Sequence, residues 1–321
     1  MRKMEVIGLG ALNMDNIYRV ERILDDGEAV IKESACFPGG SAANTIYGLA
    51  RLGVSAGFIG AVGDDADGKA LLQDFRGVGV DTTQVRVKAG EKTGSTLCLS
   101  DELGRRSIYV MPGANSQLAA DDLDLAYINQ AKWLHISSFV DDHQLGVLLG
   151  LMPKLGSSVR VSFSPGALYA GKGLRALKPI LARTYVLFIN RHEIRRLTGH
   201  DASAGAEICL EQGCRLVVVT LGKGASQEAG NAVSYVKTAE GEYLIESGCE
   251  DAAPAADTTG AGDAFAAGFL YGLLNGKGLE ECGSIGNIVA QFSIAQIGAR
   301  PGLPNLAQLA ARYEELYKQP L

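Results

Sequence analysis

The segment 257–263, which reads DTTGAGD, places two carboxylates around a glycine-rich turn. The apolar residues that follow it, from Ala264 onward, predict a helix that begins near Gly260. The first N–H groups of a helix have no partner inside it, and the helix dipole adds a positive field there. Glycines also let the backbone approach a phosphate closely. The segment therefore predicts a helix start that binds an anion such as a phosphoryl group.

Asp263 would lie one turn into this helix, beside the bound anion. A carboxylate is a poor ligand for phosphate because like charges repel. It is well suited to accept a proton from a substrate hydroxyl next to the phosphoryl group that is transferred. A structural role, in which Asp263 caps the helix and the glycines allow tight packing, would account for the same residues. The segment as a whole favours a phosphoryl-transfer site with Asp263 as the base, in a small-molecule kinase.

The elements that must hold this segment alternate between short apolar strands and longer stretches with helical periodicity. This alternation predicts an α/β fold, mainly a parallel sheet with helices on both faces, in a single domain over residues 1–321. Strands are expected at Val6–Gly10, Ala56–Val62, Trp133–Ser137, Val159–Phe163, Tyr185–Ile189 and Leu216–Leu221. Helices are expected at Ser41–Leu52, Lys69–Gly77, Leu145–Leu155, Ala204–Gln212, Ala264–Asn275 and Leu279–Gln296.

Two insertions, about residues 16–37 and 93–112, interrupt this alternation. Polar and apolar residues alternate within them, as they do in partly exposed strands, and no helix is expected between their strands. We expect them to form a small β-strand lid over the site. Unpaired strand edges on such a lid predict a contact in a homodimer.

The composition limits the kinds of partner. The chain has 321 residues, a formal net charge of −6 and 47% hydrophobic residues. Nucleic-acid binding depends on clustered lysine and arginine, so this charge argues against it. No stretch approaches the ~20 apolar residues of a membrane span, and the N-terminus lacks the apolar core of a signal peptide. The six cysteines contain no C-x-x-C pair and are expected to be reduced thiols, in a cytoplasmic protein that binds no membrane.

The segment Asp257–Asp263 resembles the C-terminal signature of the PfkB, or ribokinase-like, carbohydrate kinases. In that family the last aspartate is the catalytic base and the Gly-Ala-Gly backbone is the anion hole. The resemblance implies that Asp263 is the base and that Gly260, Ala261 and Gly262 stabilise the transferring group. It also implies a ribokinase-like three-layer fold.

A second part of the resemblance lies near the N-terminus. The pair Gly39-Gly40 precedes a predicted helix that carries Asn44, and glycines there let a hydroxylated substrate approach the backbone. The amide of Asn44, with one acceptor and two donors, suits a diol. The resemblance assigns Asp15 to a substrate hydroxyl and Asn13 to a further substrate contact. A dinucleotide-binding fingerprint would need a third glycine at position 13, so we do not expect a nicotinamide oxidoreductase.

Further matches imply sites for ATP and metal ions. Asn190 and Glu193 follow a predicted strand and match the family's Asn-x-x-Glu motif, in which the glutamate acts on Mg²⁺ through water. Capping of a helix by Asn190 explains the same pair. The resemblance places ATP against Asn190, Thr220, Gly222, Gly224 and Asn287. It places a monovalent cation, such as K⁺, at Asp257, Thr259 and Gly298.

The identity of the substrate stays open at this point. Ribokinases carry a substrate-binding glutamate after the strand Trp133–Ser137, where this sequence continues with Ser138 and Phe139. A sugar (ribose-, fructose- or ketodeoxygluconate-like) and a nucleoside (adenosine-, inosine- or cytidine-like) are therefore both candidates. Phe139, or Tyr109 from the lid, could stack on a base. A non-catalytic sugar-binding relative would lose the base, and the presence of Asp263 argues against it.

Overall fold

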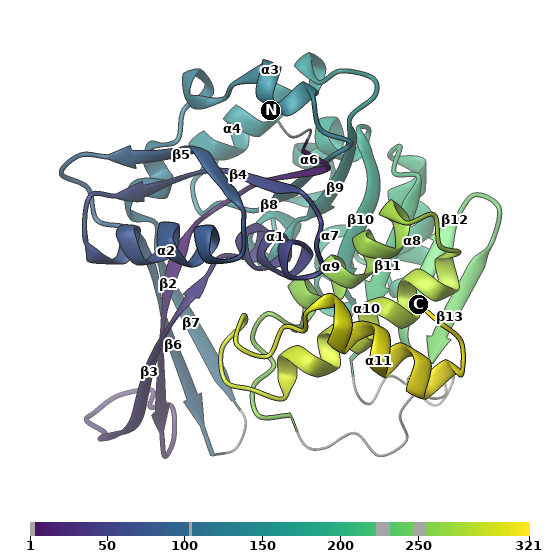
Figure 1. Ribbon diagram of the computed structural model, residues 1–321. Helices are drawn as coiled ribbons and strands as arrows, with labels where there is room; N and C mark the ends of the chain where they lie inside the picture. Colours follow the sequence, from purple (N-terminus) through teal and green to yellow (C-terminus); the bar gives the residue numbers. More distant parts are fainter. Residues whose placement is uncertain (1–3, 103–104, 223–231, 247–254) are drawn as a thin grey trace.

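The computed structural model describes residues 4–102, 105–222, 232–246 and 255–321. A nine-stranded sheet forms its centre, as Figure 1 shows. Its strands are β1 (Val6–Leu9), β4 (Ala56–Gly63), β5 (Asp81–Lys88), β8 (Trp133–Ser137), β9 (Arg160–Ser164), β10 (Thr184–Asn190), β11 (Leu216–Thr220), β12 (Ala232–Thr238) and β13 (Glu242–Glu246). They follow the order β13-β12-β11-β10-β9-β8-β1-β4-β5. All neighbours from β11 to β5 are parallel, whereas β12 and β13 form an antiparallel hairpin at one edge.

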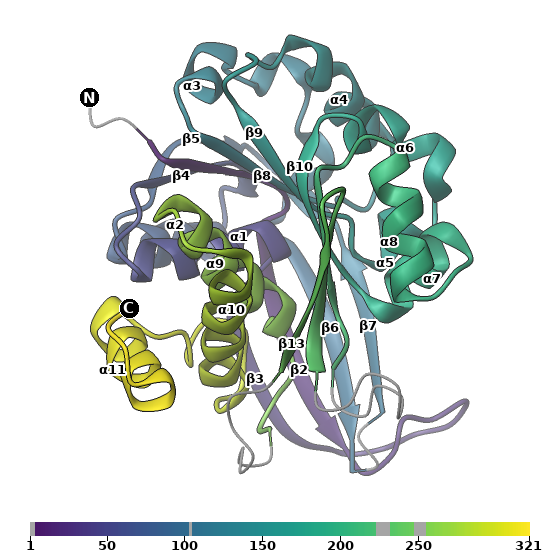
Figure 2. The same cartoon turned by 90° about the vertical axis from the view of Figure 1, so that its right-hand side faces the viewer.

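Helices cover both faces of this sheet, which makes three layers (Figure 2). One face packs against α3 (Leu125–Asn129), α4 (Asp142–Leu151), α5 (Gly166–Ala170), α6 (Gly173–Leu181), α7 (Arg191–Thr198) and α8 (Ala202–Glu211). The other packs against α1 (Ser41–Arg51), α2 (Ala66–Gly77), α9 (Ala261–Leu274) and α10 (Leu279–Ile294), with α11 (Leu306–Tyr317) on the outside of α10.

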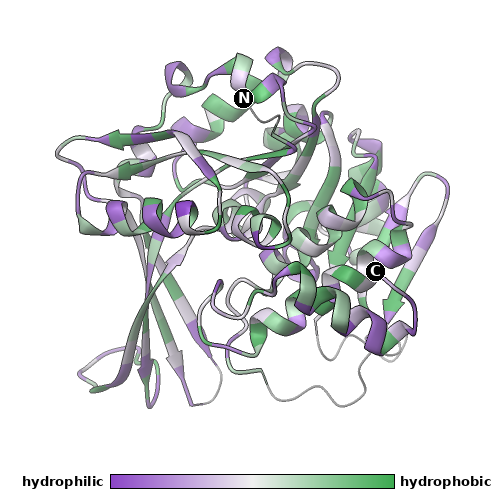
Figure 3. Cartoon of the chain, in the orientation of Figure 1, coloured by the Kyte–Doolittle hydropathy of each residue, from purple (hydrophilic) through white to green (hydrophobic). Residues whose placement is uncertain are grey.

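The central strands β1, β4, β8, β10 and β11 contribute side chains to both cores because successive residues of a strand point to opposite faces. In β1, Ile7 and Leu9 enter one core and Val6 enters the other. Figure 3 shows apolar residues concentrated along these strands and on the helix faces that cover them. The near-continuous apolar runs of the sequence follow from this burial on both sides.

A second sheet of four strands projects from the central body (Figure 1). Its strands are β2 (Asn13–Val20), β3 (Ile31–Gly39), β6 (Gly94–Asp101) and β7 (Arg106–Met111), in the order β3-β2-β6-β7. These strands cover most of the two predicted insertions. Strand β2 begins at Asn13, before the predicted start of the first insertion, because its pairing with β6 already includes Asn13 and Gly94.

Several elements differ from the sequence-based prediction. Helix α2 begins at Ala66 because Asp65 caps it and accepts a hydrogen bond from Gly68 N at 2.9 Å. Strand β5 is rich in polar residues because it lies at the exposed edge of the sheet, so its sequence lacks a strand-like apolar run. The hairpin β12–β13 was also not predicted, whereas the short polar helix α7 agrees with the alternative in which Asn190 caps a helix. None of the described helices is long and apolar enough to cross a membrane.

Candidate active site

The carboxylate of Asp263 is held by side chains of α1. Ser41 Oγ donates a hydrogen bond to Oδ1 across 2.7 Å, and Asn44 Nδ2 donates to Oδ2 across 2.9 Å. Thr45 Oγ1 donates to the backbone carbonyl of Asp263 across 3.3 Å. These contacts fix the orientation of the carboxylate at the start of α9, which begins at Ala261 as the sequence predicted.

The surroundings raise the pKa of the Asp263 carboxyl to about 7. Burial is the main cause, and the negative charges of Asp15 and Glu193 add to it, whereas the hydrogen bonds from Ser41 and Asn44 act in the opposite direction. The side chain is only half-buried because one side of it lines a pocket, but protein surrounds it elsewhere. A carboxyl with a pKa near neutrality is well matched to accept a proton from an alcohol.

The glycines at the start of α9 have different structural roles. Gly260 has a φ of 76°, and a side chain there would overlap Ala299. The Cα of Gly262, in contrast, faces open space, and this residue lines the pocket beside Asp263. The backbone at Gly262 is therefore accessible to a ligand, while Gly260 is required by the local conformation.

Two adjoining pockets lie at the carboxyl ends of the parallel strands, where α/β folds generally bind ligands. The larger, about 520 Å³, lies between the ends of β10 and β11 and the helices α9 and α10. The smaller, about 110 Å³, lies beside Asp263 and Glu193. Both are lined by Asn190, Thr220, Gly262 and Phe265, so a long ligand could extend from one into the other.

The predicted ATP residues gather around the larger pocket. Thr220, Gly222, Asn190 and Asn287 all line it. Asn287 is buried in α10, and its Nδ2 donates to the Glu246 carbonyl across 3.4 Å. Gly224 lies outside the described residues.

Asn190 and Glu193 form a capping box at the start of α7. Asn190 Oδ1 accepts hydrogen bonds from His192 N and Glu193 N, and Glu193 Oε2 accepts one from Asn190 N across 3.1 Å. Burial raises the pKa of the Glu193 carboxyl. The structural explanation of this pair is therefore observed, and Glu193 also lines the pocket that contains Asp263.

The predicted substrate residues meet where β2 and β3 leave the central body. Asp15 Oδ1 accepts a hydrogen bond from Thr96 Oγ1 across 2.7 Å, and burial raises the pKa of the Asp15 carboxyl. A side chain at Gly39 would overlap this carboxylate, so the glycine is needed for the close approach. Asn13 Oδ1 accepts a hydrogen bond from Asn115 Nδ2 across 2.9 Å.

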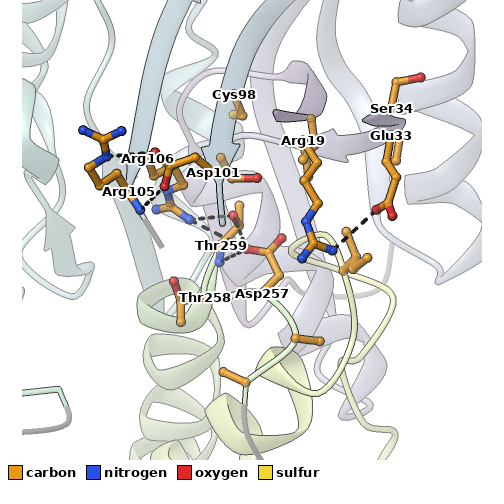
Figure 4. Close-up of a pocket in the computed structure, with 16 residues that line it drawn as sticks. Arg19, Glu33, Ser34, Cys98, Asp101, Arg105, Arg106, Asp257, Thr258 and Thr259 are labelled. Atoms are coloured by element: carbon orange, nitrogen blue, oxygen red, sulfur yellow. Dashed lines mark hydrogen bonds and ion pairs between the residues drawn. The ribbon is translucent and has the colours of Figure 1, made fainter. Parts of the chain in front are cut away.

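Asp257 and Thr259 form a tight polar cluster beneath the four-stranded sheet, as Figure 4 shows. Asp257 Oδ1 accepts from Thr259 N at 2.9 Å and from Thr259 Oγ1 at 2.7 Å, and Oδ2 accepts from Gly298 N at 3.0 Å. Arg106 of β7 donates to Thr259 Oγ1 at 2.8 Å and lies 3.7 Å from Asp257 Oδ1. Asp257 and Thr259 line a further pocket of about 440 Å³, which also includes Arg19 and Arg105.

Comparisons with known proteins show the family of this chain. The family model described as "pfkB family carbohydrate kinase" matches residues 1–306. The chain belongs to this family of carbohydrate kinases.

Individual relatives match most of the chain. An uncharacterized sugar kinase of Archaeoglobus fulgidus is 39% identical over 80% of this chain and 98% of its own length. An ATP-dependent ribose-1-phosphate kinase of Halopiger xanaduensis is 31% identical over 97% of this chain and 99% of its own. The solved structure of Arabidopsis thaliana ribokinase, complexed with ribose and ATP, has 25% identity and a TM-score of 0.79 over 95% of this chain and 97% of its own.

These matches confirm the predicted family and the ribokinase-like three-layer fold. They also confirm that the chain is an enzyme, a phosphotransferase with an alcohol group as acceptor. Its function is that of a small-molecule kinase within the pfkB family.

Sequence reasoning did not single out several residues of this pfkB site. Ser41 and Thr96 hydrogen-bond to the two acidic residues, and Arg106 and Arg300 approach the site from distant segments. A hydroxyl just after the Gly-Gly pair was a usable signal for Ser41. No signal in the sequence pointed to the other three, because their partners lie far away along the chain.

Two aromatic residues do not occupy the positions that base stacking requires. Phe139 is 2% exposed and belongs to the core, so it cannot face a substrate. Tyr109 lies one strand position beyond Ile108 and three beyond Arg106, so it points away from the face that Arg106 presents to the 440 Å³ pocket. Ser137 serves the packing of α1, since its Oγ accepts a hydrogen bond from Ala42 N across 3.0 Å.

Proposed function

We propose that this pfkB kinase uses ATP to phosphorylate a hydroxyl of a sugar, with Asp263 as the general base. The observation that carries the proposal is the position of the Asp263 carboxylate. It is held by Ser41 and Asn44 and lines the small pocket that adjoins the 520 Å³ pocket. A phosphoryl donor in the larger pocket would present its terminal group beside this carboxylate.

The sugar would bind on the other side of Asp263. Asp15 has one carboxylate oxygen that accepts from Thr96 and a second that lies against Gly39. Gly40, with φ 100°, completes a turn that only glycine adopts readily. Asp15, Gly39, Gly40, Asn13 and Asn44 would thus hold the sugar hydroxyls, and the four-stranded sheet would close over them as a lid and exclude water.

In the reaction, Asp263 would take the proton of the acceptor hydroxyl as the oxygen attacks the γ-phosphorus of ATP. The backbone of Gly260, Ala261 and Gly262 and the dipole of α9 would stabilise the negative charge of the transferring group. Glu193 fits a role near Mg²⁺ through a bound water, because the residue lines the same pocket as Asp263. When bound, Mg²⁺ would neutralise charge on the phosphates.

A monovalent cation at Asp257 would compete with Arg106. Three hydrogen-bond donors already face the Asp257 carboxylate, namely Thr259 N, Thr259 Oγ1 and Gly298 N. The Arg106 guanidinium supplies a positive charge 3.7 Å away. K⁺ would therefore have to displace this side chain, and we assign it no step of the reaction.

A phosphorylated sugar is the second candidate substrate. The 440 Å³ pocket between the four-stranded sheet and Asp257 contains Arg19, Arg105 and Arg106 (Figure 4). The pair of Arg19 with Glu33 is 3.7 Å long and exposed, so it is weak enough for Arg19 to turn toward a ligand phosphate. The similarity to a ribose-1-phosphate kinase supports the same possibility.

The test is a substrate panel with purified protein, ATP and Mg²⁺, measured by release of ADP. The panel contains ribose, fructose, 2-keto-3-deoxygluconate, ribose 1-phosphate, adenosine, inosine and cytidine. Turnover of a free sugar, with a roughly 10²–10⁴-fold lower kcat in D263N and retained ATP binding, is the expected result. Turnover of ribose 1-phosphate that R19Q and R106Q both weaken would select the second candidate. Full activity of D263N would refute the role of the base, and turnover of nucleosides alone would refute both sugar assignments.

We also propose a homodimer that forms through the four-stranded sheet. Tyr109 and Met111 of β7 are 59% and 53% exposed on the face that points away from the site. Leu97 lies opposite Tyr109 in the same sheet and extends this apolar face. A second copy of the chain, with the same face, is the partner we expect. Sedimentation equilibrium should give a dimer for the native chain and a monomer for Y109E/M111E. A native chain that is monomeric at micromolar concentration would refute the proposed homodimer.

A further inference from the structure

Arg300 is a buried cation to which the proposed chemistry assigns no role. The residue is 4% exposed. Its Nη1 donates to Asp74 Oδ2 at 2.6 Å, its Nη2 to the Gly39 carbonyl at 3.0 Å, and its Nε to Asn44 Oδ1 at 3.0 Å. One guanidinium thus joins α2, the end of β3 and the first turns of α1.

Two aromatic rings hold the guanidinium in place. Its central carbon lies 5.2 Å from the ring centroid of Tyr47 and 5.0 Å from that of Phe75. Burial of a charge destabilises a fold unless partners compensate for the lost hydration, and an apolar replacement of similar size is often at least as stable. The contacts of Arg300 therefore call for an explanation other than stability, and two of its three acceptors belong to the proposed substrate site.

The contact with Asn44 determines which way the Asn44 amide faces. An amide has its acceptor oxygen and its donor nitrogen on opposite sides. Because Arg300 can only donate, Asn44 Oδ1 must face it, and Nδ2 then points to Asp263 Oδ2 at 2.9 Å. The reverse orientation would place two donors against each other at Arg300 and two acceptors against each other at Asp263.

The contact with Gly39 acts on the substrate side. Gly39 lies directly against the Asp15 carboxylate, and its own carbonyl is held by Arg300 Nη2. Any shift of this carbonyl would move the backbone that faces Asp15. The same guanidinium therefore sets the position of the proposed base and of the proposed hydroxyl acceptor relative to each other.

We propose that Arg300 is a positioning residue of the phosphoryl-transfer site, which orients Asn44 toward Asp263 and holds Gly39 against Asp15. The inference rests on the proposed function, in which Asp263 is the base. Arg300 touches neither the substrate nor the phosphoryl group. It acts by keeping the two acidic residues in a productive arrangement, and a misplacement of about 1 Å at such a site can lower the rate roughly 10²-fold.

A role confined to folding predicts a different set of effects. A merely structural Arg300 would change the fraction of folded protein and the melting temperature, while the folded enzyme kept its kinetic constants. A positioning role predicts a fall in kcat with little change in the KM for ATP, because Arg300 is not among the residues that line the 520 Å³ pocket.

It also predicts a shift of the pH profile. Without Arg300, the Asn44 amide is no longer held with its Nδ2 toward Asp263. The hydrogen bond that lowers the pKa of the Asp263 carboxyl is then weakened, while the facing carboxylates Asp15 and Glu193 remain. The acid limb of the profile should therefore move to higher pH in the variant.

The experiment compares R300M and R300K with D74N as a matched control. The amide oxygen of D74N can still accept from Nη1, and neither Asn44 nor Gly39 loses its partner. We expect R300M to lower kcat per folded enzyme about 10²-fold. R300K should recover only part of this loss, because a single ammonium cannot serve both the Asn44 and the Gly39 acceptor. The kcat of D74N should stay within about threefold of the native value. The acid limb should move to higher pH in R300M and stay in place in D74N.

A double-mutant cycle keeps the proposal testable if R300M does not fold. If Arg300 acts through Asn44, R300K should lower kcat less in the N44A background than in the native one, since the contact is already lost. Additive effects in this cycle, or a folded R300M with native kcat and pH profile, would overturn the proposal. D263N tests the base independently, so an inactive D263N beside a fully active R300M would refute only the role of Arg300.

Discussion

Asn44 and Asp263 lie 219 positions apart in the chain, yet Asn44 Nδ2 donates a hydrogen bond to Asp263 Oδ2 across 2.9 Å. This contact joins the first turn of α1 to the first turn of α9, so the Gly-Gly turn and the glycine-rich helix start belong to one site. It also makes the protonation of Asp263 depend on the position of α1, because the donated hydrogen bond favours the charged carboxylate.

Activity should depend on pH through Asp263. The general base must be deprotonated, and its pKa in the folded protein is about 7. We expect kcat/KM for the sugar, at saturating ATP and Mg²⁺, to fall about tenfold per pH unit below pH 7 and to level off above it. Circular dichroism across the same range would confirm that the fold persists. A flat profile between about pH 5.5 and 8 would contradict this prediction.

The stability of D263N should differ from that of the native chain in a pH-dependent manner. The pKa of Asp263 is raised from 3.8 to about 7 on folding, so its contribution to stability is complete below pH 3.8 and is lost as the pH rises through 7. The amide introduced by D263N does not titrate, and it can turn its oxygen toward Asn44 and its nitrogen toward Ser41. Because the native side chain is only half-buried, solvent screening reduces the full effect. We expect D263N to gain roughly 2 kcal/mol in unfolding free energy relative to the native chain between about pH 4 and 8.

Urea denaturation at several pH values measures this difference. S41A serves as a comparison, because it removes one donor and leaves the titrating carboxyl in place. A difference between D263N and the native chain that does not change with pH would show that Asp263 has an ordinary pKa.

The glycines of α9 should separate binding from folding. G262A adds a methyl group that points into open space at the pocket, in a helix where alanine is favoured by about 1 kcal/mol. We expect an unchanged or higher melting temperature with at least a tenfold loss of kcat/KM for ATP. G260A forces a side chain into a positive φ and against Ala299, so it should lower the stability by about 1–3 kcal/mol. Equal effects of the two substitutions on stability would argue against this distinction.

The ion pair between Arg106 and Asp257 should control the response to K⁺. If a monovalent cation competes with the guanidinium, R106Q should be activated by K⁺ over Na⁺ several-fold more than the native enzyme. R105Q is the matched control, since Arg105 pairs with Asp101 at 2.8 Å. The measurement is kcat in buffers that contain either cation at equal ionic strength. An identical K⁺ response in the native enzyme and R106Q would refute the competition.

Much of the fold was predictable because its signals are local. The apolar runs of the parallel strands predicted Trp133–Ser137 with the observed bounds and most other strands within a residue or two. Strand β5 was missed because an exposed edge strand needs few apolar side chains. The capping of α7 by Asn190 was among the explanations that the sequence itself suggested, and the structure contains it.

The arrangement of the site was less predictable because its contacts cross the sheet. The sequence singled out Asp15, Asn44 and Asp263 one by one, but it contained no sign that Thr96 would bind Asp15 or that Arg300 would orient Asn44. Phe139 follows a strand that leads toward the site, and only the packing of the helices on that face shows that it is buried. Such partners depend on the distance between elements, which no local pattern records.

The sequence by itself thus determined the start of α9. The left-handed turn at Gly260 and the position of Asp263 in the first turn of the helix follow from neighbours in the chain, because helix starts depend on local conformation and local hydrogen bonds. Only the tertiary structure decided the chemistry of that aspartate. Its pKa near 7 arises from burial and from charges and donors on other elements, whose field acts only when folding brings them within a few ångströms.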